Sequence, residues 1–420
     1  MRRLYTLLLY VALPVASLIV LVRGLREREY WRGGAARFGF GPRRCGGGIW
    51  VHAVSVGEVQ AAAVLVAALR EREPKLELTL SCATPTGRAR AVSLMPGVDV
   101  RYAPYDLPGC ARRYLARLRP RLLILIETEL WPNLLREASR AGVPTLIASA
   151  RLSARSARLY RLFPGLLRTT LAANVWVGAQ SRADADRFCA LGVAPQHLRV
   201  VGNIKFEHAV PPELPQRGAQ LRARYAAGRP VWVAGSTRAG EEQIVYQAHR
   251  QLLELQPRAL LILAPRHPQR FDEAAAGAAT QGLHLIRRSR ESPDAPYEVL
   301  LLDTLGELGD FYAAADVAFV GGSLVPVGGH NLIEPAALGL PVLTGPQQFN
   351  SPEIARVMVE RGALGIVRNA AELAAAVAKL LADPPARAQQ GAAGRAVIRA
   401  NRGALAGLLA LVDQLTITVA

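Results

Sequence analysis

Acidic and basic side chains recur where apolar segments of the chain end, and several of them could act on a phosphorylated substrate. Glu58 follows an apolar segment that ends at Val54, and Gly57 just before it permits a tight turn. A carboxylate partly buried in a cleft has a raised pKa and can take a proton from an attacking hydroxyl. The alternative is an ordinary acidic residue in a first helical turn, where the helix dipole favours negative charge.

A second acidic group follows the apolar segment LLILI. The motif ETELWPN brings Glu127, Glu129 and Asn133 to the end of that segment. Two carboxylates cannot both be buried there without partners, so we expect at least one to pair with an arginine or with backbone donors. The motif predicts either substrate contacts or a structural ion-pair network. No His or Asp cluster with metal spacing accompanies it, so we expect no catalytic metal.

Two motifs in the second half of the chain could bind phosphate. VWVAGSTRAGEE places Ser236 and Thr237 between a strand and a helix, where small residues let backbone N–H groups approach an anion. The same residue types are common helix caps. APRHPQRF then places Arg266 and His267 after the next strand, where they offer hydrogen-bond donors to a phosphate or carboxylate. The alternative for this motif is a basic surface turn.

The longest motif is GGSLVPVGGHNLIEPAALGLPVLTGP. Its centre is a flexible turn at a helix start, suited to phosphate, made of Gly328, Gly329, His330 and Asn331. Glu334 lies about one turn after His330 on the same helical face. Its carboxylate could accept hydrogen bonds from two neighbouring ribose hydroxyls, and the alternative is an exposed helix residue.

The elements that position these motifs alternate between short apolar segments and amphipathic helical stretches, as in parallel βαβ units. We expect strands over 49–54, 76–82, 122–126, 144–149, 175–180, 231–236, 259–265, 299–303, 317–322 and 341–345. Each distinctive motif follows one of these strands directly. The carboxyl ends of parallel strands are where such sheets bind ligands, so we expect the motifs to gather there.

The length of 420 residues favours two α/β domains, and the only Pro-rich break within the body lies between Gly202 and Pro230. We expect a membrane anchor over 1–24, a first Rossmann-like domain over 25–205, a linker over 206–229 and a second Rossmann-like domain over 230–420. Both would be doubly wound and would face each other across a cleft. The last helix, near 404–415, could pack back across the boundary.

Composition narrows the classes of partner. The chain is 51% hydrophobic and 20% charged, which argues against long disordered regions. A net charge of +18 favours polyanions, although arginine enrichment also arises from GC-rich coding. Signatures of nucleic-acid binding are absent, so we expect no nucleic-acid partner. The four widely separated cysteines indicate free thiols in a reducing compartment.

The N-terminal segment predicts membrane attachment. Leu4–Val22 is uncharged and long enough to cross a bilayer as a helix. A cleaved signal peptide is the alternative, but no small-residue cleavage site follows. Seven arginines from Arg23 to Arg44 follow this segment, and the positive-inside rule then keeps the body in the cytoplasm. The sequence leaves open whether the anchor spans the bilayer or lies in its interface.

The motifs SVGEV, ETELWPN, GNIKFE, PRHPQRF and GGSLVPVGGHNLIEPA, in this order after an anchor, resemble those of the Kdo transferases. These are inverting glycosyltransferases of the GT-B fold, and the resemblance covers almost the whole chain. It implies transfer of Kdo (3-deoxy-D-manno-octulosonic acid) from CMP-Kdo to lipid IVA, the phosphorylated lipid A precursor. It also implies lipopolysaccharide synthesis on the cytoplasmic face of a bacterial inner membrane, with no cofactor.

The same resemblance implies roles for single residues. Glu58 matches the family's proposed catalytic base, and the donor side is matched by Ser236, Thr237, Arg266, His267, Asn331 and Glu334. Arg238 stands where His is usual and Gln269 where Glu is usual, which leaves those two contacts open. The competing functions are a UDP-sugar glycosyltransferase, a sugar-nucleotide epimerase of similar architecture, and a non-catalytic protein that binds anionic lipid.

Overall fold

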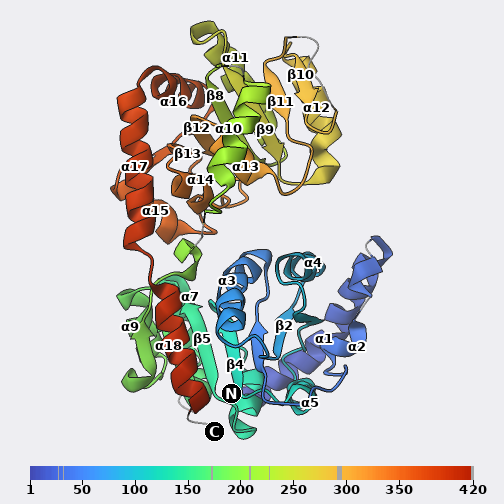
Figure 1. Ribbon diagram of the computed structural model, residues 1–420. Helices are drawn as coiled ribbons and strands as arrows, with labels where there is room; N and C mark the ends of the chain where they lie inside the picture. Colours follow the sequence, from blue (N-terminus) through green and yellow to red (C-terminus); the bar gives the residue numbers. More distant parts are fainter. Residues whose placement is uncertain are drawn as a thin grey trace. The chain divides into compact units, whose positions relative to one another are not determined.

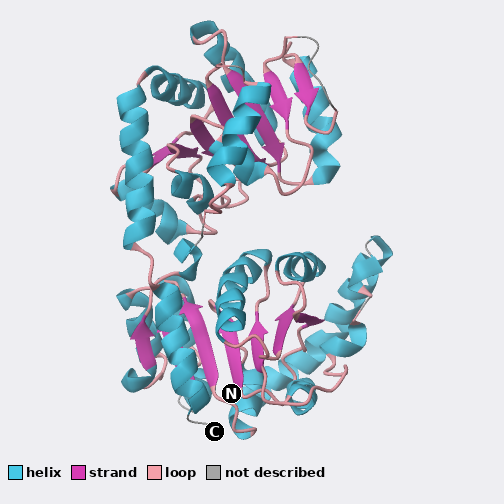
Figure 2. Ribbon diagram, in the orientation of Figure 1, coloured by secondary structure: helices cyan, strands magenta, loops and turns pink. Residues whose placement is uncertain are grey.

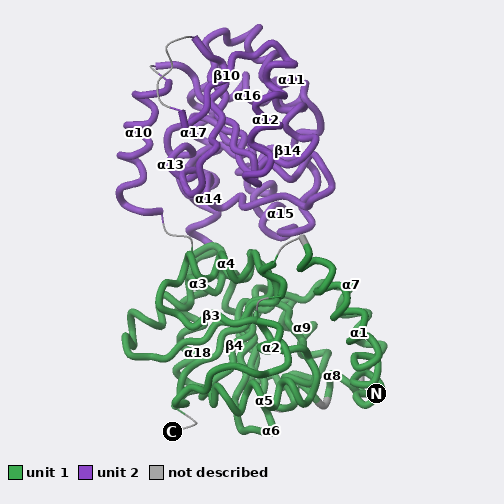
Figure 3. Tube along the Cα trace, turned by 90° about the vertical axis from the view of Figure 1, so that its right-hand side faces the viewer, with its two compact units in different colours: residues 1–207, 401–420 green, residues 208–400 purple. Residues whose placement is uncertain are grey.

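The computed structural model describes residues 1–26, 28–31, 33–171, 174–207, 210–226, 228–290 and 296–417. They form two compact α/β units, whose elements are drawn in Figures 1 and 2 and whose extents are coloured in Figure 3. Unit 1 is made of Met1–Glu207 and Asn401–Ala420, and unit 2 of His208–Ala400. Each unit has its own sheet and its own hydrophobic core, so each is described by itself.

The sheet of unit 1 has seven strands in the order β3-β2-β1-β4-β5-β6-β7, and every neighbouring pair is parallel. The strands are β1 (Ile49–His52), β2 (Leu78–Cys82), β3 (Asp99–Tyr102), β4 (Leu122–Ile126), β5 (Thr145–Ala150), β6 (Val175–Ala179) and β7 (Leu198–Val200). Its helices are α1 (Arg2–Arg26), α2 (Gly34–Arg37), α3 (Val56–Arg72), α4 (Pro85–Leu94), α5 (Pro108–Leu118), α6 (Pro132–Arg140), α7 (Ala154–Arg161), α8 (Pro164–Leu171), α9 (Arg182–Ala190) and α18 (Ala404–Ile417).

Helices cover both faces of this sheet because its central strands are apolar on both sides. In β1, Ile49 and Val51 pack with α3 and α18, whereas Trp50 packs into the cluster formed with α5, α6 and α9. A strand buried on both faces reads as a continuous apolar run rather than an alternating one. The run from Leu122 to Ile126 shows this pattern, and all five of its residues are buried.

Unit 2 repeats the design. Its sheet has the order β10-β11-β9-β8-β12-β13-β14, again with parallel neighbours. The strands are β8 (Val231–Thr237), β9 (Leu260–Pro265), β10 (Leu285–Arg287), β11 (Val299–Leu301), β12 (Val317–Val320), β13 (Val342–Thr344) and β14 (Leu364–Ile366). The helices are α10 (Leu214–Tyr225), α11 (Glu241–Leu255), α12 (Phe271–Thr280), α13 (Leu308–Ala313), α14 (Ile333–Leu338), α15 (Pro352–Glu360), α16 (Ala370–Ala382) and α17 (Pro384–Ala400). The expectation of two doubly wound Rossmann-like domains is confirmed.

All ten expected strands are present, within a few residues of their expected bounds. The structure adds β3, β7, β10 and β14, and these are the four edge strands of the two sheets. Each is only three or four residues long, and three of them carry an arginine. Edge strands are short and more polar because one side is unpaired, so they lack the apolar run by which the central strands were recognised.

The last helix corrects the expected second domain. The sequence assigned 230–420 to that domain, but residues 401–420 belong to unit 1. Leu408 and Leu411 of α18 are buried in the unit 1 core, and the carboxylate of Glu207 accepts hydrogen bonds from the backbone N–H groups of Gly403 (2.6 Å) and Leu405 (3.2 Å). An apolar helix thus finds its partner in the unit where the chain began.

The expected linker over 206–229 is largely structured. It contains α10, which packs on α13 through an ion pair between Arg217 and Asp310 (2.7 Å) and through Gly218, which lies against Ala313. Residues 208, 209 and 227 of this segment lie outside the described part of the chain.

Candidate functional site

Four of the motifs follow the two strands in each sheet where the winding direction reverses, whereas Arg266 and His267 follow β9. In unit 1 the reversal lies between β1 and β4, and Glu58 follows β1 while Glu127 and Glu129 follow β4. In unit 2 it lies between β8 and β12, which lead into the Ser236–Thr237 motif and the long glycine motif. Loops diverge from such a switch point and leave a crevice, which is the usual ligand site of doubly wound sheets.

Glu58 forms a capping box at the start of α3. Ser55 is the N-cap, and its hydroxyl oxygen accepts from the Glu58 N–H (3.3 Å). The Glu58 carboxylate accepts in return from the Val54 N–H (2.7 Å) and from the Ser55 hydroxyl (2.8 Å). Glu58 therefore has the structural role of an acidic residue in a first helical turn, which was the alternative raised by the sequence. Any chemical role must be performed by a carboxylate that also makes these capping hydrogen bonds.

Charge and burial nevertheless make Glu58 unusual. Its pKa is raised to about 7, mainly by burial and also by charge repulsion from Glu129 and Glu127, and the two hydrogen bonds to its carboxylate oppose this shift. A carboxylate with a pKa near the working pH is suited to general-base catalysis, because it is largely deprotonated and yet able to hold a proton.

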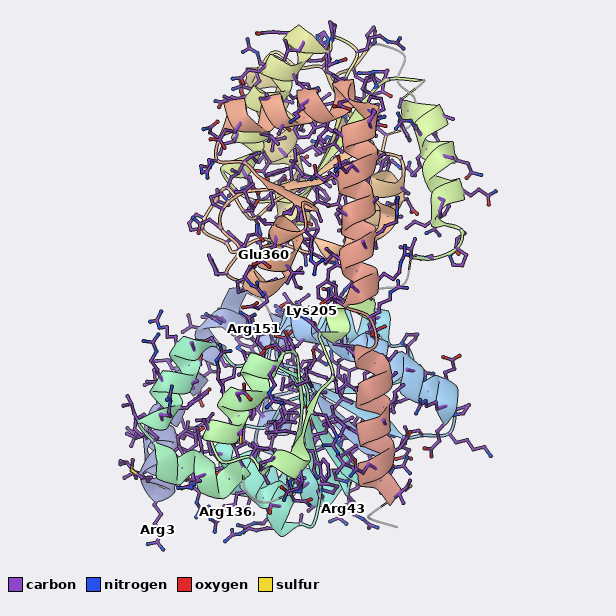
Figure 4. The ribbon with its side chains drawn as sticks, turned by 90° about the vertical axis from the view of Figure 1, so that its left-hand side faces the viewer. Arg3, Arg43, Arg136, Arg151, Lys205 and Glu360 are labelled. Carbon is purple, nitrogen blue, oxygen red and sulfur yellow. The ribbon has the colours of Figure 1, made fainter. Side chains whose placement is uncertain are left out.

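Glu127 is held in a strained conformation beside it. Its φ of 62° lies in the left-handed region, which side chains other than glycine rarely adopt. Lys205 forms an ion pair with its carboxylate at 2.5 Å, and the adjacent Thr128 donates to the Arg151 carbonyl. Figure 4 labels Lys205 and Arg151 at this edge of unit 1. For one carboxylate of ETELWPN we expected an arginine or backbone donors as partner, whereas the charged partner of Glu127 is a lysine, Lys205, which the local sequence did not single out.

The segment that carries Lys205 is itself fixed to the sheet. The Ser149 hydroxyl oxygen at the end of β5 accepts from the Ile204 N–H (3.2 Å), and the side chain of Asn203 accepts from the Lys205 N–H (3.0 Å). Asn203 also donates to the side chain of Gln180 (3.2 Å) after β6. The motif GNIKFE was the available signal for Lys205, but its approach to Glu127 depends on the order of the strands.

Glu129 and Asn133 have different surroundings. The Trp131 indole N–H donates to Glu129 (2.7 Å), and burial raises the pKa of that carboxyl. Asn133 is fully buried: its amide donates to the Asp106 carbonyl (2.7 Å), and its backbone N–H donates to the Asp106 carboxylate (3.3 Å). Its hydrogen bonds join α6 to the segment after β3, which is a structural arrangement, whereas Glu129 stays near Glu58.

Arg238 joins the three motifs of unit 2. It follows Thr237, its guanidinium donates to His330 Nε2 (3.1 Å), and it contacts His267. Burial and the neighbouring arginines lower the pKa of His330 to about 4, and the pKa of His267 is lowered by the same causes. Both rings are therefore neutral near pH 7. Arg238, which stands where the resemblance leads us to expect His, thus lies at the centre of this cluster.

Glu241 holds the loop after β12. Its fully buried carboxylate accepts from three successive backbone N–H groups, those of Gly322 (2.6 Å), Ser323 (3.0 Å) and Leu324 (2.9 Å). It also accepts from the Arg238 N–H (3.1 Å). The local sequence does not indicate this role of Glu241, because its partners lie about eighty residues further along the chain.

The glycines of the long motif are required by the backbone. Gly328 and Gly329 have φ values of 102° and 76°, and a Cβ on Gly329 would lie 2.5 Å from the Gln348 side chain. The Asn331 side chain accepts from the Ile333 N–H (3.1 Å), and Glu334 follows in the first turn of α14. His330 joins this loop to Arg238, whereas the Glu334 carboxylate lies near Gly309 and Tyr312.

Three further observations limit the site. Arg270, which follows the histidine of its motif, pairs with the buried Glu242 (3.0 Å) and with Glu273 (2.8 Å). A cavity of about 460 Å³ in unit 2, next to Asp316 and Pro341, lies at the amino ends of β12 and β13, on the opposite edge from the motifs. Among the described residues, no group of three or more His, Cys, Asp or Glu side chains is arranged to hold a metal ion.

Comparisons with known proteins decide the family. The family described as "3-Deoxy-D-manno-octulosonic-acid transferase (kdotransferase)" matches residues 32–208, and "Glycosyl transferases group 1" matches residues 294–397. The 3-deoxy-D-manno-octulosonic acid transferase of Haemophilus influenzae is 40% identical over 98% of this chain and 97% of its own. That of Bordetella pertussis is 42% identical over 96% of both chains. The chain belongs to the Kdo transferases.

As a Kdo transferase, the protein is a glycosyltransferase, and this excludes the epimerase and the non-catalytic lipid-binding protein as its main function. The fold alone could not have excluded them. A putative UDP-N-acetylglucosamine 2-epimerase from Listeria monocytogenes, 15% identical, covers 88% of this chain and 96% of its own with a TM-score of 0.58. Architecture is shared between these classes, whereas the family match and the identity over nearly the whole chain distinguish the Kdo transferases.

Proposed function

We propose that the protein transfers Kdo from CMP-Kdo to lipid IVA with inversion at the anomeric carbon, and that Glu58 is the general base. The observation that carries this proposal is the Glu58 carboxyl, which has a pKa of about 7 at the switch point of unit 1. Other acidic residues at that point are held differently, since Glu127 pairs with Lys205 and Glu129 accepts from Trp131.

In this mechanism Glu58 takes the proton of an acceptor hydroxyl. The hydroxyl oxygen forms a bond to the anomeric carbon of Kdo, and the bond from that carbon to the phosphate oxygen breaks on the opposite face. CMP leaves with the electron pair. Charge that develops on the leaving phosphate calls for fixed donors, which act most strongly where water is excluded.

Unit 2 offers such donors. Arg238 and Arg266 supply positive charge, and the neutral rings of His267 and His330 supply hydrogen bonds beside them. Ser236 and Thr237 end β8, and Gly328, Gly329 and Asn331 shape the adjoining loop. We assign the CMP moiety to this group, with Glu334 accepting from the ribose hydroxyls.

The base is tested by comparing two capping boxes. Glu372 makes the same box at α16, accepting from the Arg368 N–H (2.9 Å) and donating its own N–H to Asn369 (2.9 Å). General-base assistance is worth about 10²–10⁴-fold in rate, so Glu58→Gln should lower kcat by that order while Glu372→Gln leaves it near normal. The assay is mass spectrometry of lipid IVA incubated with CMP-Kdo generated in place. A Glu58→Gln protein as active as Glu372→Gln would remove Glu58 as the base.

The donor assignment is tested by calorimetry with CMP. Glu334→Ala should weaken CMP binding by about 1–3 kcal/mol, the cost of leaving hydrogen-bond partners unmatched. Glu353→Ala, in the first turn of α15, is the matched control because that glutamate is exposed and pairs with Arg356. Equal CMP affinity in the two variants would exclude Glu334 from the ribose site.

We also propose attachment to the cytoplasmic face of the bacterial inner membrane. The helix Arg2–Leu25 is long and apolar enough to cross a membrane by length and composition, with a mean hydropathy of 2.3 in its most apolar window and no buried residue in that window. The net charge of +18 suits an anionic lipid surface and a phosphorylated acceptor.

A further inference from the structure

The helix α1 has two different faces along its length. Its half-buried residues recur every three or four positions, at Tyr5, Leu9, Leu13, Ala16 and Val20. On the other face, exposed fractions are 55% for Leu4, 68% for Val11, 61% for Val15, 59% for Leu18 and 54% for Val22. At about 100° per residue these two sets lie on opposite sides of the helix. One side of α1 is therefore half-buried, and Figure 3 shows the helix running beside the rest of unit 1.

The first turns of α1 are hydrogen-bonded to unit 1. The Tyr5 hydroxyl donates to the Asp106 carboxylate (2.8 Å), and the Thr6 hydroxyl donates to the Asn133 side chain (3.1 Å). Met1 also approaches α8, since a Cβ built on Gly165 would lie 3.8 Å from its Cγ. Asp106 and Asn133 are the pair that joins α6 to the segment after β3, so α1 is fixed to a rigid part of the fold.

The other end of α1 is held as well. The Trp31 indole N–H donates to the Leu21 carbonyl (3.0 Å), and the Trp31 ring packs so close to Gly24 that a Cβ there would overlap it. The Tyr102 hydroxyl at the end of β3 donates to the Glu29 carbonyl (3.1 Å). Both ends of the helix are thus tied to unit 1.

These contacts conflict with a spanning helix. To cross a hydrocarbon core of about 30 Å, α1 would have to leave unit 1 lengthwise. Tyr5 and Thr6 would then reach the headgroups of the far leaflet and lose their hydrogen bonds to Asp106 and Asn133. The apolar composition of α1 alone permits either a spanning helix or one that lies beside the rest of unit 1. The hydrogen bonds and the half-buried face both favour a helix that stays beside the rest of unit 1.

The exposed face fits an anionic bilayer surface. It is apolar throughout, and Arg3 and Arg23, both exposed, flank it at its two ends. Near the first turn of α1, the α7–α8 corner adds the exposed side chains of Leu159, Leu162 and Phe163. A helix that lies in the membrane interface inserts its apolar side chains at the boundary of the acyl chains, and its cationic side chains bind the lipid phosphates. The exposed face of α1 has both kinds of side chain.

We propose that α1 lies flat in the membrane–water interface as a docking surface for anionic lipid, with residue 3 and the body of the protein on the same side of the bilayer. This inference rests on the proposed membrane location but not on the transferase chemistry. It predicts that the outward residues of α1 all reach one depth.

Depth is measured with spin labels on single cysteines at Leu4, Val11, Leu18 and Val22, in a Cys45→Ser/Cys189→Ser background, because Cys82 and Cys110 are buried. The full-length protein is reconstituted into phosphatidylglycerol-containing bilayers. A flat helix gives four equal depths of about 5–10 Å. Val11 near the bilayer centre, with Leu4 and Val22 near opposite headgroups, would overturn the proposal.

Sidedness gives an independent test in cells. A membrane-impermeant maleimide should label Arg3→Cys in inverted membrane vesicles and not in intact spheroplasts. In a separate Cys45→Ser protein, labelling of the native Cys189 reports on which side of the membrane the body of the protein lies. Labelling of Arg3→Cys only in spheroplasts would show that α1 spans. Complete release of the protein from membranes by low-salt washing would refute the proposal that α1 docks on lipid. Transferase activity measured with soluble donor and dispersed acceptor would be unaffected by that result, so the two proposals fail separately.

Discussion

At the scale of single residues, Glu58 combines a helix cap with a chemically useful pKa, and the two roles oppose each other. The capping hydrogen bonds stabilise its charged form, while burial and Glu129 destabilise it. The net pKa of about 7 lies above the value of an ordinary glutamate, so the folded protein binds a proton here more tightly than the unfolded chain does.

This pKa predicts how activity depends on pH. A general base works only when deprotonated, so kcat should rise through about pH 7 and level off above it. Initial rates from pH 5.5 to 9 at saturating donor measure the profile. A flat profile across that range would contradict the assignment of the base.

The same pKa predicts a stability effect with a definite sign. Because the folded pKa is raised, the folded state binds more protons than the unfolded state between about pH 4.5 and 7, and stability falls as pH rises through that window. Glu58→Gln lacks this titration, so its melting temperature relative to the wild type should rise between pH 5 and pH 8. Glu372→Gln should show no such trend over the same pH range.

At the scale of elements, Glu241 joins α11 to the loop after β12. Glu241→Gln keeps one oxygen but turns an amide NH₂ towards backbone donors, so part of the loop loses its acceptor. We expect a lower melting temperature and weaker CMP binding, at about 1–3 kcal/mol for each N–H left unsatisfied. Glu254→Gln, at the exposed end of the same helix, is the control. Unchanged CMP affinity in Glu241→Gln would show that the loop does not need this anchor.

The return of α18 to unit 1 predicts where a core mutation acts. Leu408 is fully buried in the unit 1 core, so Leu408→Ala should cost about 2–5 kcal/mol of stability. Ile417→Ala, on the same helix but 75% exposed, should cost little. CMP affinity should stay the same in both, because the residues that we propose for the donor are in unit 2. A Leu408→Ala protein as stable as Ile417→Ala in denaturant titrations would contradict the packing.

The central strands and the motifs after them were predictable from local sequence, because apolar runs and strand-end residues are local signals. The edge strands were not, since β3 and β7 lack those runs. Lys205 and Glu241 were also missed as partners, because each meets its counterpart only through strand order or across some eighty residues. The order of the strands in each sheet and the packing of α18 on unit 1 depend on long-range contacts, which a local sequence pattern does not encode.

At the scale of the whole molecule, the chain builds one architecture twice and equips each copy differently. Unit 1 carries carboxylates at its switch point, and unit 2 carries arginines, histidines and glycines. An acidic group suits removal of a proton from a neutral hydroxyl. A basic group suits a phosphate that gains charge as it leaves.

That difference predicts that turnover needs no divalent metal. Transferases that depend on a metal present carboxylates to bridge it to a diphosphate, whereas the proposed donor has one phosphate, to which we assign the neighbouring Arg238 and Arg266 of unit 2. Initial rates after dialysis against EDTA should match those of the untreated protein. The control is an equal concentration of the Mg²⁺–EDTA complex, which separates chelation from effects of EDTA on the lipid acceptor. A rate that vanishes in EDTA, persists in Mg²⁺–EDTA and returns on adding Mg²⁺ would show that a metal, rather than the arginines, neutralises the leaving phosphate.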